Sequence, residues 1–283
     1  LGLPICFQDV LYNVAAVLAD GEIVGLVPKE NLATGDVQYE NRWFSGWHRG
    51  HVEQFRSPSG EQIPFGSVLF EAKGLGRFAV EICEDGWKGY RPGSAYSLAG
   101  ALILANPSAS WFVLGKHRVR RQMVEQISRE DHCVYLYTSL LGCDATRLVF
   151  DGSLFISQDG KTLQEGRRFL FQEEYELIDR VVDLGALIRT RMEEGSWRQQ
   201  SDAQLLGEFG DRPVVVHVSG DFSTEAPAPA VSPYWLPEAE PGADPSLDWL
   251  AEANLTPEFT PRDIPHLELE LALCLGLREY IKK

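Results

Sequence analysis

Hydrophobic and polar residues alternate along much of residues 11–156, which is the pattern of strands with one buried face. Residues 11–29 alternate around Asp20 and Gly21, and this dipeptide is the strongest short-range signal for a β-hairpin. Residues 67–83 repeat the pattern around glycines at 74–76. The two hairpins are expected to place Lys29 just past one strand end and Cys83 at another.

The pattern predicts more strands after Cys83. Residues 101–110 begin with a continuously apolar run, 101–105, as in a strand buried on both faces, and we expect this strand to stop in a loop at Asn106 and Pro107. Further strands are expected in three apolar segments, at residues 133–140, 148–157 and 175–184.

One helix is expected among these strands, over residues 114–131. Its apolar stripe has four-residue spacing: Val119, Met123 and Ile127. Strands interleaved with helices predict an α/β (α+β layered) domain that ends near residue 200.

A change in composition follows this domain. Ten of the sixteen prolines fall from Pro213 onward, so residues 201–263 read as an extended linker anchored by Trp235 and Leu236. Residues 264–283 are expected to form a helix with one apolar face, made of Leu267, Leu271, Cys274 and Leu275.

Charge and cysteine content exclude several classes of protein. The net charge is -15 and the basic residues are scattered, so neither nucleic acid nor a membrane surface is an expected partner. The five cysteines form no C-x-x-C pair, which fits a reducing cytoplasm. No signal peptide or membrane span is apparent, and because the first residue is Leu1 we expect a piece of a longer chain.

Cys83 is the candidate for covalent chemistry. A cysteine reacts as its thiolate, so a catalytic one needs a base or a positive neighbour and an accessible corner. No histidine carries a protease-like signature, whereas Lys29 lies at a second strand end. A lone thiol at a strand end is also a common core residue. His48 and His51 lack further ligands at metal spacing, so no metal site is expected.

Four segments carry a family resemblance: "GLVPKENL", "YENRWF", "EICEDGW" and "GCDATRLVFDG". Together they resemble the glutaminase half of the glutamine-dependent NAD synthetase family, a branch of the nitrilase (carbon-nitrogen hydrolase) superfamily. The resemblance covers residues 1–200, and "HLELELALCLGLREYIKK" is similar to the first helix of that family's synthetase domain. It implies a nitrilase-type αββα sandwich that lacks its N-terminal strand and helix.

The resemblance also implies roles for individual residues. Cys83 is the expected nucleophile, Lys29 and the backbone N–H of Glu84 the expected oxyanion donors, and Glu40 an additional carboxylate. The family's base glutamate is expected upstream of Leu1, so residues 1–283 alone should be nearly inactive. The loop after the next strand binds glutamine in the family, which implies substrate-binding roles for Ser110 and Lys116.

The implied reaction is glutamine hydrolysis through a cysteine thioester, with ammonia passed to a synthetase domain. That domain would use ATP and Mg²⁺ to amidate nicotinic acid adenine dinucleotide, and no cofactor is expected in the present segment. Nitrilase sandwiches pair, so a homo-oligomer is expected. Two alternatives remain open: a stand-alone amidase acting on another carboxamide, and a non-catalytic nitrilase-like scaffold.

Overall fold

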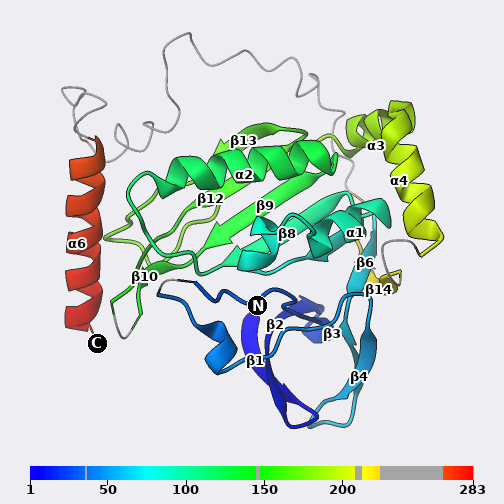
Figure 1. Cartoon of the computed structure of the whole chain (residues 1–283), viewed down its shortest axis with the longest axis horizontal. Helices are drawn as coiled ribbons and strands as arrows, with labels where there is room; N and C mark the ends of the chain where they lie inside the picture. Colours follow the sequence, from blue (N-terminus) through cyan, green and yellow to red (C-terminus); the bar gives the residue numbers. More distant parts are fainter. Residues whose placement is uncertain (36, 145–146, 208–211, 224–263, 283) are drawn as a thin grey trace.

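The computed structural model describes residues 1–35, 37–144, 147–207, 212–223 and 264–282 (Figure 1). The strands in chain order are β1 Gly2–Phe7, β2 Val10–Ala19, β3 Glu22–Pro28, β4 Val52–Arg56, β5 Gln62–Gly66, β6 Val68–Lys73, β7 Gly76–Val80, β8 Ile103–Ser108, β9 Val134–Ser139, β10 Leu141–Cys143, β11 Val149–Asp151, β12 Leu154–Gln158, β13 Lys161–Glu165 and β14 Val214–Asp221. The helices are α1 Pro92–Leu98, α2 Lys116–Glu130, α3 Leu184–Glu193, α4 Gly195–Leu205 and α6 Ile264–Lys282, with short 3-10 turns η1 Glu40–Arg42 and η2 Cys83–Trp87.

Two sheets make the body of the molecule. One has five strands in the order β1-β2-β3-β5-β4, and the other has seven in the order β13-β12-β9-β8-β7-β6-β14. Val17 and Val27 of the first sheet pack against Val68, Phe70 and Val218 of the second, so the sheets form a sandwich. Helices α1 and α2 cover one face of the seven-stranded sheet (Figure 1).

Both predicted hairpins are confirmed. β2 and β3 pair antiparallel across Asp20 and Gly21, whose φ angles of 51° and 84° are those that a tight hairpin turn requires. β6 and β7 pair antiparallel across the turn at Gly74. β7, β8 and β9 then run parallel, so their carboxyl ends meet at one edge of the sheet.

The strand predicted at residues 175–184 is wrong, because residues 175–183 form no strand and Leu184 begins α3. Its alternation is nevertheless real: Ile178 and Val182 pack against the sheet, while Tyr175 and Leu177 are exposed. An extended segment lying on a sheet has the same periodicity as a strand but makes no ladder hydrogen bonds.

The end of β8 and the buried face of α2 also differ from the predictions. β8 continues through Asn106 and Pro107 to Ser108, because the parallel pairing with β9 persists to that point. The predicted helix is α2, but Val119 lies on its exposed side, while Ile127 is buried and Met123 partly so.

Part of the predicted linker, within the described residues 201–207 and 212–223, forms regular elements. Residues 201–205 complete α4, and β14 adds to the edge of the seven-stranded sheet parallel to β6. Trp235 and Leu236 lie outside the described residues.

Helix α6 forms as predicted and runs alongside β10 (Figure 1). Leu267 and Leu275 are buried against Phe169 and Leu271 packs beside them, whereas Cys274 faces away and is exposed. Within the described residues, no helix is both long and apolar enough for a bilayer.

Candidate active site

Cys83 lies in a sharp turn after β7. The strand ends at Val80, three residues earlier than predicted, and Cys83 begins the 3-10 turn η2. Its φ angle is 47°, a conformation that non-glycine residues adopt rarely and at a cost in free energy. Only 8% of the residue is exposed, and it packs beside Ala15 and Ile82. Such strained corners occur where surrounding contacts fix a side chain for function.

A cavity of about 610 Å³ connects Cys83 with both sheets. Lys29 and Glu40 line it beside the five-stranded sheet, and Ser108 and Thr138 line it at the carboxyl ends of β8 and β9. The remaining lining residues are Gly2, Asn13, Val14, Ala15, Gln38, Ile82, Pro107, Ala109, Ser139, Leu140 and Phe150. The structure therefore brings three of the predicted residues, Cys83, Lys29 and Glu40, to one cavity.

Lys29 is 2% exposed, and its ammonium group forms an ion pair with Glu40 Oε2. Glu40 is held in turn, because Asn13 Nδ2 donates to its Oε1 at 2.8 Å and the Ala33 N–H donates to its Oε2 at 2.7 Å. The lysine head consequently has a fixed place in the cavity wall.

Asp85 joins the loop after Lys29 to the turn that carries Cys83. Its Oδ1 accepts hydrogen bonds from the backbone and side-chain nitrogens of Asn31 at 2.7 and 2.8 Å, and its Oδ2 accepts the Ile82 N–H at 3.0 Å. Burial raises the pKa of Asp85, although these hydrogen bonds and Lys29 oppose the shift. Glu84 instead pairs with Lys88 at 2.6 Å, near solvent.

The two predicted substrate-binding residues, Ser110 and Lys116, are not among the residues that line the cavity. The Ser110 hydroxyl accepts a hydrogen bond from Arg120 Nε at 3.3 Å. The Lys116 ammonium lies 3.6 Å from the ring centroid of Trp111. Burial and the charge of Arg120 together lower the pKa of Lys116 to about 8, while the nearby Cys83 opposes the shift.

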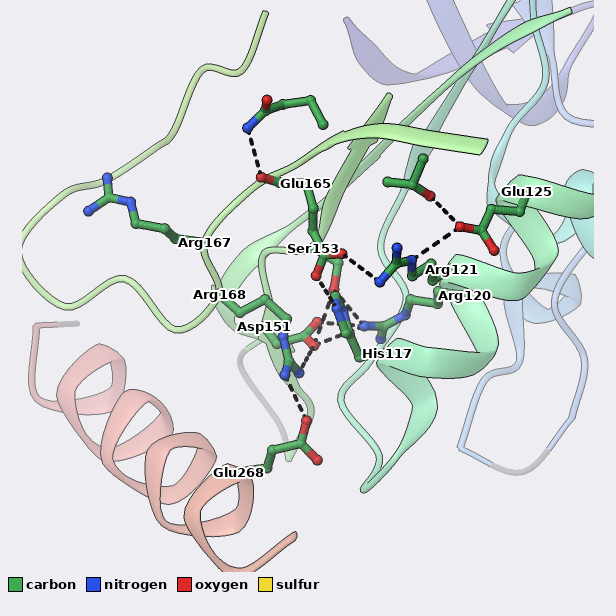
Figure 2. Close-up of polar contacts among 12 residues, drawn as sticks. His117, Arg120, Arg121, Glu125, Asp151, Ser153, Glu165, Arg167, Arg168 and Glu268 are labelled. Carbon is green, nitrogen blue, oxygen red and sulfur yellow. Dashed lines mark hydrogen bonds and ion pairs between the residues drawn. The ribbon is translucent and has the colours of Figure 1, made fainter. Parts of the chain in front are cut away.

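A buried charge network anchors the loop that contains Ser110. Figure 2 shows Asp151 between Arg120 and Arg168, with Glu268 reaching in from α6. Arg120 Nη1 donates to both Asp151 oxygens at 2.7 and 2.9 Å, and its Nη2 donates to the Ser110 carbonyl at 2.8 Å. Arg168 donates to Asp151 Oδ2 at 3.3 Å and to Glu268 Oε1 at 2.7 Å.

Sequence reasoning missed several buried polar residues around Cys83. The clearest is Asn106, which was assigned to a loop and instead lies inside β8, 1% exposed and bonded to the Cys83 backbone. Glu81 and Tyr135 extend the same network. A polar residue inside a continuously apolar strand was the available signal, because buried polar groups need partners.

The described residues contain no group of His, Cys, Asp and Glu side chains that could hold a metal ion. His51 contacts Glu53 at 3.0 Å in an exposed position.

No family model matches the chain. A glutamine-dependent NAD(+) synthetase from Oryza sativa subsp. indica is 28% identical over 258 residues, which make up 88% of this chain and 35% of the relative. The chain thus spans about a third of the length of this curated relative.

Solved structures of related proteins are also similar to this chain. A glutamine-dependent NAD(+) synthetase from Cytophaga hutchinsonii matches with a TM-score of 0.55 and 36% identity, over 61% of this chain and 28% of that one. A carbon-nitrogen hydrolase from Helicobacter pylori G27 matches with a TM-score of 0.52 and 18% identity, over 70% and 66% of the two chains. The chain therefore resembles glutamine-dependent NAD(+) synthetases in sequence and has the fold of the nitrilase superfamily.

Proposed function

We propose that this chain is the glutamine-hydrolysing part of a glutamine-dependent NAD synthetase. The observation that carries the proposal is the cavity that Cys83, in its strained turn, shares with the Lys29–Glu40 ion pair. The similarity to synthetases from rice and from Cytophaga hutchinsonii supports the choice of glutamine as substrate.

In the proposed reaction, the Cys83 thiolate attacks the side-chain amide carbon of glutamine. A glutamate upstream of Leu1 takes the thiol proton and passes it to the departing nitrogen, so ammonia leaves and a γ-glutamyl thioester remains. Water then attacks the thioester, which releases glutamate and returns the proton to the thiol.

Lys29 and the backbone N–H of Glu84 are the proposed donors to the oxyanion. An ammonium fixed by Glu40 needs no reorganisation during the reaction, and one such donor contributes about 3 kcal/mol to transition-state stabilisation. Glu40 is thereby assigned to holding Lys29 rather than to proton transfer.

Lys116 is the proposed partner of the substrate carboxylate. It lies close enough to Cys83 for the two charges to interact, and its ammonium is a point charge without the bidentate geometry of arginine. Ser110 stays a proposed binding residue, and its hydroxyl also accepts a hydrogen bond from Arg120.

The ammonia is proposed to serve ATP- and Mg²⁺-dependent amidation of nicotinic acid adenine dinucleotide in a further domain, in a cytoplasmic homo-oligomer. The similarity of residues 266–283 to the first synthetase helix supports this larger arrangement.

A substrate panel tests the proposal. Ammonia release by the full-length protein should be highest with glutamine, and Cys83→Ala should abolish it, while Cys6→Ala, which removes an exposed thiol, should not. Equal turnover of simple carboxamides would favour a stand-alone amidase. No turnover of any amide by the folded protein would favour a scaffold.

A further inference from the structure

The backbone of Cys83 is held by a single side chain. The Cys83 N–H donates to Asn106 Oδ1 at 3.1 Å, and Asn106 Nδ2 donates to the Cys83 carbonyl at 3.3 Å. One amide therefore holds both polar backbone groups of the residue with the unfavourable φ of 47°. The contact joins β8 to the turn after β7.

Asn106 is itself fixed by two further contacts. Its Nδ2 also donates to the Tyr135 hydroxyl at 2.9 Å, and its Oδ1 also accepts the Ser108 hydroxyl at 2.7 Å. The amide thus makes two bonds as a donor and two as an acceptor, which uses its full capacity and specifies its orientation. Ser108 also lines the cavity, so the same amide connects Cys83 to the cavity wall.

The chain of bonds ends at a buried carboxylate. The Tyr135 hydroxyl donates to Glu81 Oε1 at 2.6 Å, and the Gly93 N–H donates to Glu81 Oε2 at 2.9 Å. Because each bond in the row Asn106, Tyr135, Glu81 is donated in the same direction, the carboxylate polarises the whole row.

Two glycines leave room for this row. A Cβ atom at position 93 would lie 2.5 Å from Glu81 Oε2, and one at position 86 would lie 2.8 Å from both Asn106 Nδ2 and the Tyr135 hydroxyl. Any larger residue at either position would displace these side chains.

We propose that Asn106 is the positioning residue of the nucleophile, and that Tyr135 and Glu81 act through it to hold Cys83 in its reactive turn. As a statement about catalysis, this inference rests on the proposed function. As a statement about the turn, it stands on the hydrogen bonds alone.

The test uses Tyr135→Phe, which removes the central hydroxyl without touching Cys83. Two quantities are measured on the full-length protein: amide hydrogen exchange in peptides spanning residues 80–87, and the rate at which a diazo-ketone analogue of glutamine modifies Cys83. We expect hydrogen exchange in residues 80–87 to rise and the modification rate to fall about tenfold. A change of this size corresponds to the loss of one or two hydrogen bonds that hold the turn. Peptides from β12 and β13 should exchange as in the wild type.

Ser157→Ala is the matched control, because it removes a buried hydroxyl that bonds to Thr162 at 3.1 Å between β12 and β13. It should leave the Cys83 turn and its modification rate unchanged. Asn106→Ala removes both side-chain hydrogen bonds to the Cys83 backbone. If this variant folds, its hydrogen exchange at residues 80–87 should rise more, and its modification rate fall further, than in Tyr135→Phe.

Two results with Tyr135→Phe would overturn the inference: an unchanged turn with a modification rate within about twofold of wild type, or faster exchange throughout the sheet, which would indicate a merely structural role. If the wild type is not modified at all, the proposed function fails instead, and hydrogen exchange still decides whether Asn106 holds the turn.

Discussion

Two carboxylates, Asp151 and Glu81, are equally buried in the seven-stranded half of the molecule, but their surroundings differ. Asp151 is 0% exposed and lies between Arg120 and Arg168 (Figure 2), whereas Glu81 is 1% exposed and accepts hydrogen bonds from neutral groups. Burial raises the pKa of both, but the two arginines lower that of Asp151 below its ordinary value. The pKa of Glu81 rises to about 7, because Tyr135 and the more distant Arg91 compensate burial only in part.

The difference separates an anchor from a tunable group. The Asp151 network ties α2, the loop at Ser110 and α6 together, and the two arginines favour the ionised form of the Asp151 carboxylate. Glu81 lies at the end of the row of hydrogen bonds that leads to Cys83. With a pKa of about 7, its carboxyl group gains or loses its proton near neutral pH. Four changes should break or sharpen this comparison.

Asp151→Asn should have the largest effect on stability. It leaves two buried arginines without their shared carboxylate, and such a loss destabilises a protein by about 3–5 kcal/mol. Urea unfolding at pH 7 measures the change in the free energy of unfolding. A loss below about 1 kcal/mol would show that Asp151 is no anchor.

Glu81→Gln should change the pH dependence of stability. A group whose pKa is raised on folding stabilises the protein below its unfolded pKa, and this contribution is lost as pH rises toward the folded pKa. With values of 4.5 unfolded and about 7 folded, the wild type should lose about 3 kcal/mol over this window relative to the variant. Urea unfolding of both proteins from pH 4.5 to 7.5 measures this difference, and parallel curves would contradict it.

The contribution of Asp151 to stability changes with pH in the opposite direction. Because its pKa is lowered on folding, its contribution is present above the unfolded value of 3.8 and is lost as pH falls below it. Asp151→Asn should therefore flatten the acid limb of the stability curve. Near neutral pH, the variant should be less stable than the wild type by an amount that does not change with pH.

Glu268→Gln should have a smaller and more local effect. It removes the charge that α6 contributes to Arg168, while Asp151 still pairs with that arginine, so a loss of about 1–3 kcal/mol is expected. Hydrogen exchange should rise in α6 and at the loop of Phe169, and not in β7 or η2. Exchange that rises equally in the Cys83 turn would show that the two networks are one.

Lys73→Ala should reduce stability least among the four variants. This lysine pairs with Asp221 on the surface, where both side chains are at least half exposed, and solvent screening leaves such pairs little effect on stability. A loss larger than that of Glu268→Gln would contradict the assignment of stability to burial.

The hairpins were predictable because their signals are local. Asp20 and Gly21 determine a turn through their own backbone preferences, and the motif around Cys83 carries its resemblance within seven residues. The strand-end positions of Lys29 and Cys83 already suggested that the two could meet, whereas the place of Glu40 beside them was expected only through the family resemblance.

The missed features depend on partners far away in the chain. An apolar segment becomes a strand only where another strand is available to pair with it. β14 pairs with β6, whereas residues 175–183 form no strand. Asn106 was assigned to a loop because Asn-Pro is a turn signal, yet its fourfold hydrogen bonding inside β8 stabilises the strand there.

The central claim is that Cys83 is a nucleophile for a glutamine amide, and covalent labelling tests it most directly. The full-length protein is incubated with a diazo-ketone analogue of glutamine, and the adduct is located by intact mass and peptide mapping. We predict one adduct, on the nearly buried Cys83 rather than on the exposed Cys6 or Cys274, and excess glutamine should block it. A folded protein that stays unlabelled at Cys83, or is labelled there regardless of glutamine, would contradict the account.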